Sequence, residues 1–175
     1  MIYLLRHGHA GNKQAWDGPD GQRPLSATGR REAAGLVVQL RARPVGAVLS
    51  SPALRCQQTV QPLAEQRRLP VGLDGRLDVE AEAEQAAALL FSPDLGDTVL
   101  CTHGELIGGL LELLRNDGAP IARDARWPKG STWVLRPVAG RIADATYLPP
   151  LQATDPPRDG YHGPAQPPDV QEAGE

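Results

Sequence analysis

The chain begins with Ile2-Tyr3-Leu4-Leu5-Arg6-His7-Gly8, a short run of large apolar residues that ends in an arginine, a histidine and a glycine. Such a run, with no polar residue inside it, is typical of a strand that is buried on both faces of a sheet. Two later stretches repeat the pattern, namely 46–55 (GAVLSSPALR) and 98–104 (TVLCTHG). Because segments of helical period follow each of them, we expect an α/β domain in which buried strands alternate with helices.

The other elements are expected from the same patterns. Ser26 is predicted to cap a helix that ends before Pro44, and Ser51-Pro52 is predicted to start a second helix that runs to about Arg67. Further expected elements are a strand over 71–73, a helix over 80–90, a helix over 106–114, a long loop over 116–130 and a closing strand pair over 131–137 and 141–147.

Composition excludes several classes of protein. The 175 residues carry a formal net charge of −3, without the positive excess that a nucleic-acid polymer or an anionic membrane would require. The two cysteines lie far apart and outside any metal-ligand spacing, so neither a disulfide scaffold nor a zinc site is expected. Because Arg6 interrupts the first apolar run, we expect no signal peptide, no membrane span and a cytoplasmic protein.

The domain is expected to cover residues 1–148. Seven prolines and few aliphatic residues fall within 149–175, which we therefore expect to be a disordered tail. The cations are unevenly distributed between residue types, since Lys13 and Lys129 are the only lysines among the 18 lysines and arginines.

The residues that can carry chemistry follow three expected strands. Arg6 and His7 end the first, Arg55 lies just after the second, and His103 follows the fourth. Ligands bind at this carboxyl edge in open α/β sheets, and the guanidinium fork of arginine matches the oxygens of a phosphate. A neutral imidazole among arginines can attack phosphorus, while a second histidine can donate to the phosphoryl oxygens. Arg55 at a helix N-terminus is unfavourable unless an anion lies nearby.

Three motifs carry a family resemblance: Arg6-His7-Gly8, Ser51-Pro52-x-x-Arg55-x-x-x-Thr59 and Thr102-His103-Gly104. Over about residues 1–148, the chain resembles the histidine phosphatase superfamily, also called phosphoglycerate mutase-like. The resemblance implies a three-layer α/β/α fold with a central mostly parallel sheet. It also implies a phosphohistidine on His7, a phosphate pocket built from Arg6, Arg55 and His103, and neither metal nor cofactor.

Two branches of this family are similar to the chain. Its length and Arg23-Pro24-Leu25-Ser26 resemble the small SixA-type branch, which acts on phosphohistidine in proteins. A closer likeness is to the phosphatase domain of two-domain MutT-type Nudix hydrolases, and it rests on Gly11-x-Lys13, Arg55-Cys56-x-Gln58-Thr59, Pro62-Leu63-Ala64 and 129–135 (KGSTWVL). We expect these motifs to stand without a preceding Nudix domain, so the resemblance by itself does not carry over the nucleotide role of the two-domain proteins.

The proton donor to the leaving group is an open question. Larger relatives place a glutamate where Leu77-Asp78-Val79-Glu80 has valine, so Asp78 or Glu80 could substitute, or there could be no carboxylic acid. We include Glu80 among the candidate catalytic residues. The residues expected to contact substrate are Gly8, Lys13, Arg23, Gly104 and Lys129, with both lysines at the pocket mouth.

The resulting hypothesis is a metal-independent phosphatase that acts through a phosphohistidine on His7. Its substrate would be a phosphorylated nucleotide, another small metabolite or a phosphohistidine protein. The alternative is a catalytically weak module that binds phosphate or a phosphoprotein on the same fold. The sequence leaves the oligomeric state open.

Overall fold

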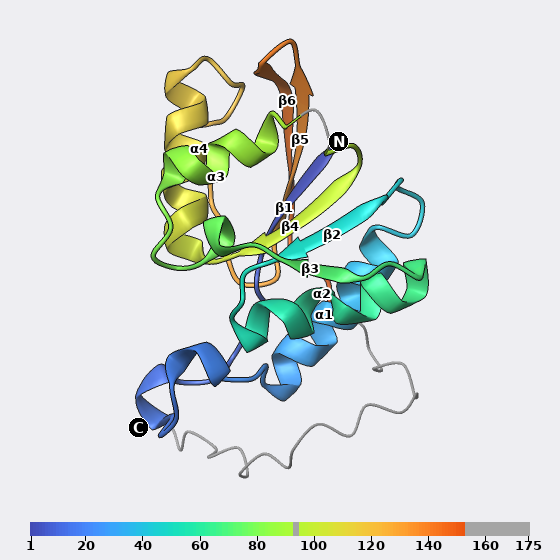
Figure 1. Ribbon diagram of the computed structural model, residues 1–175, viewed down its shortest axis with the longest axis vertical. Helices are drawn as coiled ribbons and strands as arrows, with labels where there is room; N and C mark the ends of the chain where they lie inside the picture. Colours follow the sequence, from blue (N-terminus) through green and yellow to red (C-terminus); the bar gives the residue numbers. More distant parts are fainter. Residues whose placement is uncertain (93–94, 153–175) are drawn as a thin grey trace.

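The computed structural model describes residues 1–92 and 95–152, and its strands form one six-stranded sheet (Figure 1). The strands are β1 (Ile2–Arg6), β2 (Ala47–Ser50), β3 (Val71–Leu73), β4 (Thr98–Thr102), β5 (Thr132–Val138) and β6 (Arg141–Leu148), in the order β3-β2-β4-β1-β5-β6. The first four strands run parallel, whereas β5 is antiparallel to both β1 and β6. The expected mostly parallel sheet is confirmed. Most of the expected tail, residues 153–175, lies outside the described residues.

Helices cover both faces of the sheet. In Figure 1, α1 (Ala27–Gln39) and α2 (Leu54–Arg67) lie on one side, and α3 (Ala83–Leu90) and α4 (Gly104–Asn116) lie on the other. Three short 3₁₀ helices complete the elements: η1 (Lys13–Ala15), η2 (Asp20–Gln22) and η3 (Gly75–Leu77). The expected three-layer α/β/α fold is therefore confirmed.

The side chains of β1 alternate between two apolar clusters. Ile2 and Leu4 pack in the cluster that contains α3 and α4, while Tyr3 and Leu5 pack in the cluster that contains α1 and α2. All four are at most 1% exposed. Both faces of this strand are thus buried, which explains its continuous apolar sequence and fixes where its carboxyl end delivers the next residues.

Two expected helix starts are wrong in detail. The helix expected over 80–90 begins at Ala83, because Glu80 lies in a turn before it. Ser51 does not cap α2: the cap residue is Ala53, and the Ser51 hydroxyl turns towards His103 instead. By contrast, the Ser26 hydroxyl accepts the amide of Gly29 at 3.2 Å and caps α1 as expected.

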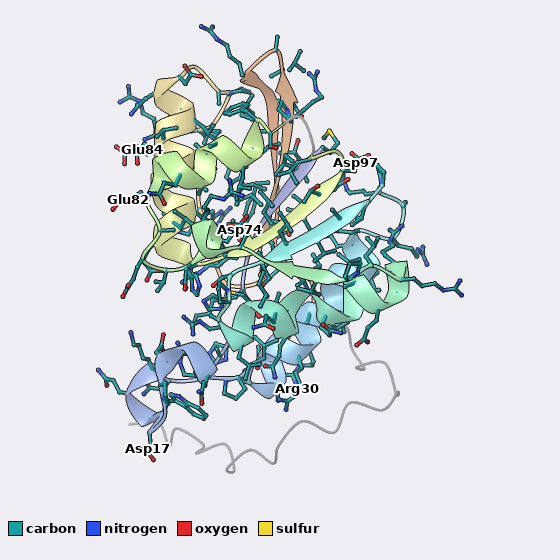
Figure 2. The ribbon with its side chains drawn as sticks, in the orientation of Figure 1. Asp17, Arg30, Asp74, Glu82, Glu84 and Asp97 are labelled. Carbon is teal, nitrogen blue, oxygen red and sulfur yellow. The ribbon has the colours of Figure 1, made fainter. Side chains whose placement is uncertain are left out.

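The connection between β1 and α1 projects from the carboxyl edge of the sheet. It contains η1 and η2, drawn in blue in Figure 1, and Figure 2 places Asp17 at its outer end. Asp97 marks the opposite edge, where its carboxylate pairs with the N-terminal ammonium of Met1 at 2.7 Å. Within the described ranges, no helix is long and apolar enough to cross a membrane.

Candidate active site

A cavity of about 120 Å³ lies at the carboxyl edge of the parallel strands. Its wall is cationic, with five lysines and arginines, two histidines and two acids around one valine. The lining residues are Arg6, His7, Lys13, Asp20, Arg23, Arg55, Val79, His103, Glu105 and Lys129. The polar ends of β1, β2 and β4 are thus brought to one place, because these three strands are neighbours in the sheet.

His7 follows β1 and is 6% exposed. Its Nδ1 lies 2.7 Å from the carbonyl oxygen of Gly8, and since a carbonyl only accepts, Nδ1 carries the proton. The neutral ring therefore has its lone pair on Nε2. The pKa of His7 is lowered to about 3, mainly by burial and in addition by the charges of His103, Arg55 and Arg6, while the hydrogen bond to Gly8 acts to raise it. At neutral pH the ring is uncharged and can act as a nucleophile.

Arg6 is held between two loops. Its Nη1 donates to the carbonyl oxygen of Trp127 at 2.9 Å, and its guanidinium lies directly over Gly104. A Cβ at residue 104 would come within 2.6 Å of Arg6 Cζ, so the guanidinium can take this position only because residue 104 has no side chain. The Nε of Arg6 is buried and has no hydrogen-bond partner among the described residues, which leaves a donor for a bound anion.

Arg55 lies in the first turn of α2 and is 3% exposed. Its Nη1 donates to the main-chain oxygen of Asp20 at 2.7 Å, and its Nη2 pairs with Asp20 Oδ2 at 3.1 Å. Asp20 Oδ1 also accepts from Arg23 Nε at 2.9 Å. Although burial acts to raise it, these two arginines hold the pKa of Asp20 below its usual value. Arg55 Nε is buried without a partner in the described structure, as is Arg6 Nε.

His103 connects Arg55 to a chain of hydrogen bonds behind the cavity. Its Nδ1 lies 3.3 Å from Arg55 Nη2 and accepts, because a guanidinium only donates. The proton of the neutral ring is then on Nε2, which donates to Ser51 Oγ at 2.9 Å, and that hydroxyl donates to Asp78 Oδ1 at 3.2 Å. The two rings of His7 and His103 meet edge to face, with centroids 5.3 Å apart. Donation from His103 to a phosphoryl oxygen requires one of these contacts to be exchanged.

The backbone around His7 is fixed by buried polar groups. The amide of Gly8 donates to Thr59 Oγ1 at 2.9 Å, and that hydroxyl donates to the carbonyl of Arg55 at 2.6 Å. On the other side, the amide of Gly130 donates to the carbonyls of Arg6 and His7 at 3.2 and 3.1 Å. Motifs from α2 and from the loop before β5 therefore hold the strand end that presents His7.

The structure brings most of the expected residues together. Lys13, Arg23 and Lys129 line the cavity with the histidines and with Arg6 and Arg55. Lys13 is exposed and Lys129 is half-buried. The expected contact residues Gly8 and Gly104 instead support the site through Thr59 and Arg6, and Glu80 is exposed and outside the cavity wall.

Two cavity residues were missed from the sequence. Asp20 lies in the projecting loop, where no pattern indicates that it meets Arg55 across 35 positions of the chain. Glu105 lies in the first turn of α4, where an acidic residue is common for its effect on the helix dipole alone. Its position two residues after His103 was the only available signal.

In the part of the chain that the structure describes, no three histidine, cysteine, aspartate or glutamate residues gather in a way that could hold a metal ion. The cationic cavity has the opposite character, since arginine and lysine side chains only donate hydrogen bonds and attract anions.

The chain is similar to known proteins in sequence and in fold. The family model of the histidine phosphatase superfamily (branch 1) matches residues 2–80, which include the first two motifs. An 8-oxo-(d)GTP phosphatase of Mycolicibacterium smegmatis is 34% identical over 154 residues, which are 85% of this chain and 48% of that protein. The chain thus spans about half the length of this curated relative.

Solved structures with the same fold include protein histidine phosphatases. The protein histidine phosphatase SixA in complex with tungstate gives a TM-score of 0.68 at 20% identity, covering 86% of this chain and 96% of that one. A protein from Agrobacterium tumefaciens assigned as phosphohistidine phosphatase SixA gives a TM-score of 0.65 at 25% identity, covering 85% and 97%.

Proposed function

Because the chain belongs to the histidine phosphatase superfamily, we propose that it is a metal-independent phosphatase in which His7 takes up the phosphoryl group. The observation that carries the proposal is the state of His7: the ring is buried and neutral, with its proton on Nδ1 and its lone pair on Nε2. A nucleophile at phosphorus needs this lone pair at working pH.

The phosphoryl group would lie between His7 and the arginines Arg6 and Arg55, whose Nε atoms are both buried. The unpartnered Nε donors of Arg6 and Arg55 supply fixed hydrogen bonds to its oxygens. Donors that are already in place stabilise the charge that spreads over these oxygens in the transition state, which is the main source of rate enhancement in phosphoryl transfer. His7 Nε2 forms the bond to phosphorus while the leaving oxygen departs, and water then hydrolyses the phosphohistidine.

The substrate we favour is the terminal phosphoryl group of a nucleotide. Two observations support this choice. The relative from M. smegmatis is named for its action on 8-oxo-(d)GTP. In addition, Lys13, Arg23 and Lys129 add cations beyond those that one phosphoryl group needs, and a second phosphate of a nucleoside diphosphate or triphosphate would meet them.

Other substrates are the alternatives within the same chemistry. A phosphohistidine protein is supported by the likeness to the A. tumefaciens SixA protein, and another phosphorylated metabolite would fit the same cationic cavity. The cytoplasmic location expected from the sequence remains part of this proposal.

The test is to trap the phosphoenzyme. Purified protein incubated with ³²P-labelled nucleoside triphosphate should acquire an acid-labile, base-stable label on His7 and release nucleotide in a burst. His7→Ala should lose both the label and the turnover, while still binding tungstate through the arginines. Turnover that persists in His7→Ala, or a wild-type protein that binds phosphate without any label or burst, would refute the enzyme and favour the binding module.

The substrate is tested separately with the same protein. Its kcat/KM for nucleoside diphosphates and triphosphates should exceed that for sugar phosphates and for a phosphohistidine-bearing protein. A preference for the phosphohistidine protein would overturn the nucleotide assignment and leave the His7 chemistry intact.

A further inference from the structure

We propose that Lys129 is the proton donor to the leaving oxygen, a catalytic residue that takes the place of the carboxylic acid expected at this step. The inference rests on the proposed function, since it requires that His7 displaces a leaving group from phosphorus. It is argued from the positions of the acidic residues around the cavity and from the position of Lys129 itself.

Asp20 and Asp78 already serve as hydrogen-bond acceptors for neighbouring groups. Asp20 accepts hydrogen bonds from Arg23 and Arg55, and these partners favour its carboxylate over the acid. Asp78 accepts from the Ser51 hydroxyl and, at 2.8 Å, from the amide of Val79. It lies behind His103 and does not line the cavity. Asp20 is thus held as an acceptor by two arginines and Asp78 lies outside the cavity wall, so neither is placed to give a proton to the leaving oxygen.

The other two acids are poorly placed. Glu80 is exposed and does not line the cavity, whose wall at this point is Val79. Glu105 does line it, but its side chain is exposed to solvent in the first turn of α4. A general acid has to stay within hydrogen-bond reach of the leaving oxygen, and an exposed side chain is less well fixed for this than one half-buried in the cavity wall.

Lys129, in contrast to these acids, is well placed to donate a proton inside the cavity. It is half-buried in the cavity wall, next to Gly130, whose amide is bonded to the carbonyls of both Arg6 and His7. The turn that carries the lysine is therefore fixed to the same strand end as the nucleophile. Among residues 1–92 and 95–152, no carboxylate forms an ion pair with its ammonium.

The surroundings also make this ammonium a better acid. Burial lowers the pKa of Lys129, and the charges of Arg6, Arg23 and Arg55 lower it further against the attraction of Glu32. A lysine carries its proton at neutral pH in its ordinary range, and a lowered pKa makes the proton easier to transfer. The other lysine of the cavity, Lys13, is exposed and near Asp20, so it serves as the matched comparison.

The two steps balance as follows. His7 Nε2 forms the N–P bond while the P–O bond to the leaving group breaks, and the leaving oxygen takes the electron pair and a proton from Lys129 Nζ. Water then attacks phosphorus and gives a proton to the neutral Lys129 amine, and the electrons of the N–P bond return to His7. The enzyme ends with His7 neutral and Lys129 protonated, as it began.

The consequence concerns which leaving groups the site accepts. The less basic oxygen of a leaving phosphate needs little help, whereas an alcohol leaves as a basic alkoxide unless it is protonated. With Lys129 as donor, the same cavity can hydrolyse an alkyl phosphomonoester as well as a phosphoanhydride, without a carboxylic acid in the donor's role.

The experiment compares kcat/KM for benzyl phosphate, which releases an alcohol, with that for p-nitrophenyl phosphate, which releases a weakly basic phenolate. Lys129→Arg keeps the positive charge but gives up its proton far less readily. Relative to wild type, the loss of kcat/KM in this variant should be about 100-fold larger for benzyl phosphate than for p-nitrophenyl phosphate. A factor of about 100 is the lower end of what a general acid contributes to the rate. Lys13→Arg should change both substrates by the same factor.

A second variant separates proton donation from folding or binding. Lys129→Ala should regain activity on benzyl phosphate when ethylammonium is added, since a free amine can replace the missing donor. The quantity that decides is kcat/KM for benzyl phosphate divided by kcat/KM for p-nitrophenyl phosphate. The proposal is overturned if this ratio in Lys129→Arg stays within about threefold of the wild-type ratio, because the usual effect of a general acid is larger. It is also overturned by a ratio that changes in Glu105→Gln and not in Lys129→Arg, which would assign the proton to Glu105.

The proposed function fails in a different way. A wild-type protein that forms no phosphohistidine and hydrolyses neither substrate refutes the phosphatase, and the role of Lys129 falls with it. A wild-type protein that forms the phosphohistidine, with the ratio unchanged in Lys129→Arg, refutes the donor alone.

Discussion

Replacing Gly104 by alanine tests whether the site depends on the close approach of Arg6 to the start of α4. The new Cβ would lie 2.6 Å from Arg6 Cζ and 2.8 Å from its Nε and Nη2. The guanidinium would have to retreat by about 0.8 Å to reach ordinary van der Waals contact at 3.4 Å. Gly104 has no positive φ, so alanine fits its backbone, and the displaced group is the end of a flexible side chain.

The expected loss is therefore in activity, with little change in stability. Displacing one fixed donor costs on the order of 100-fold to 1000-fold in rate, or about 2.7–4 kcal/mol. We expect Gly104→Ala to lower kcat/KM for p-nitrophenyl phosphate by about 100-fold and to weaken inhibition by tungstate. Alanine favours a helix over glycine, so the free energy of unfolding should change by less than about 1 kcal/mol.

The control lies in the same helix. In Gly109→Ala the new Cβ would meet Ala83 of α3 at 3.2 Å, away from the cavity, and activity should stay within about twofold, as for a substitution outside the site. The decisive assay is a double-mutant cycle, in which Gly104→Ala has no further effect once Arg6 is alanine. An equal loss in both backgrounds, or a Gly104→Ala protein within about threefold of wild type, would refute the role assigned to this contact.

Two further predictions concern stability. The pKa of His7 is lowered from 6.5 to about 3, so below pH 6.5 the unfolded state binds the proton first and stability falls with pH. Between pH 7 and pH 5, urea titration should show wild type losing about 2 kcal/mol more than His7→Gln; equal losses would contradict the buried neutral ring. Thr59→Val leaves the buried amide of Gly8 without its acceptor and should cost about 1–3 kcal/mol. Thr59→Ser retains the hydroxyl, so a serine variant as unstable as the valine variant would count against the hydrogen bond.

Much of the fold could be predicted from short apolar runs. The run at 2–5 is buried on both faces, and that property follows directly from its composition. The parallel strands and the helices after them follow from the same alternation of patterns. The strand order was not predictable in this way, because the placement of β4 between β2 and β1 depends on packing between segments about 50 and 100 positions apart.

The residues of the candidate site were predictable from the sequence where they lie at the end of a strand or directly after it. Arg6, His7 and His103 each directly end or follow a strand, so their convergence needs only neighbouring strands. Ser51 shows the limit: a serine before a proline is typical of a helix cap, and only the position of His103 reveals that its hydroxyl has another partner. Glu80 was similarly considered from local sequence, whereas its distance from the cavity wall is a property of the turn in which it lies.

Asp20 reduces the repulsion between the cations that line the cavity. Five lysines and arginines around about 120 Å³ repel one another, and Arg55 adds its charge to the positive N-terminus of α2. The carboxylate of Asp20 lies between Arg55 and Arg23 and supplies the negative charge that this helix start requires. The main-chain oxygen of Asp20 accepts a second hydrogen bond, from Arg55 Nη1. The buried Nε of Arg55 has no hydrogen-bond partner in the described structure. Asp20 thus orients the guanidinium and neutralises part of its charge while leaving a donor for phosphate, so that a chain of near-neutral composition can concentrate cations at one anion site.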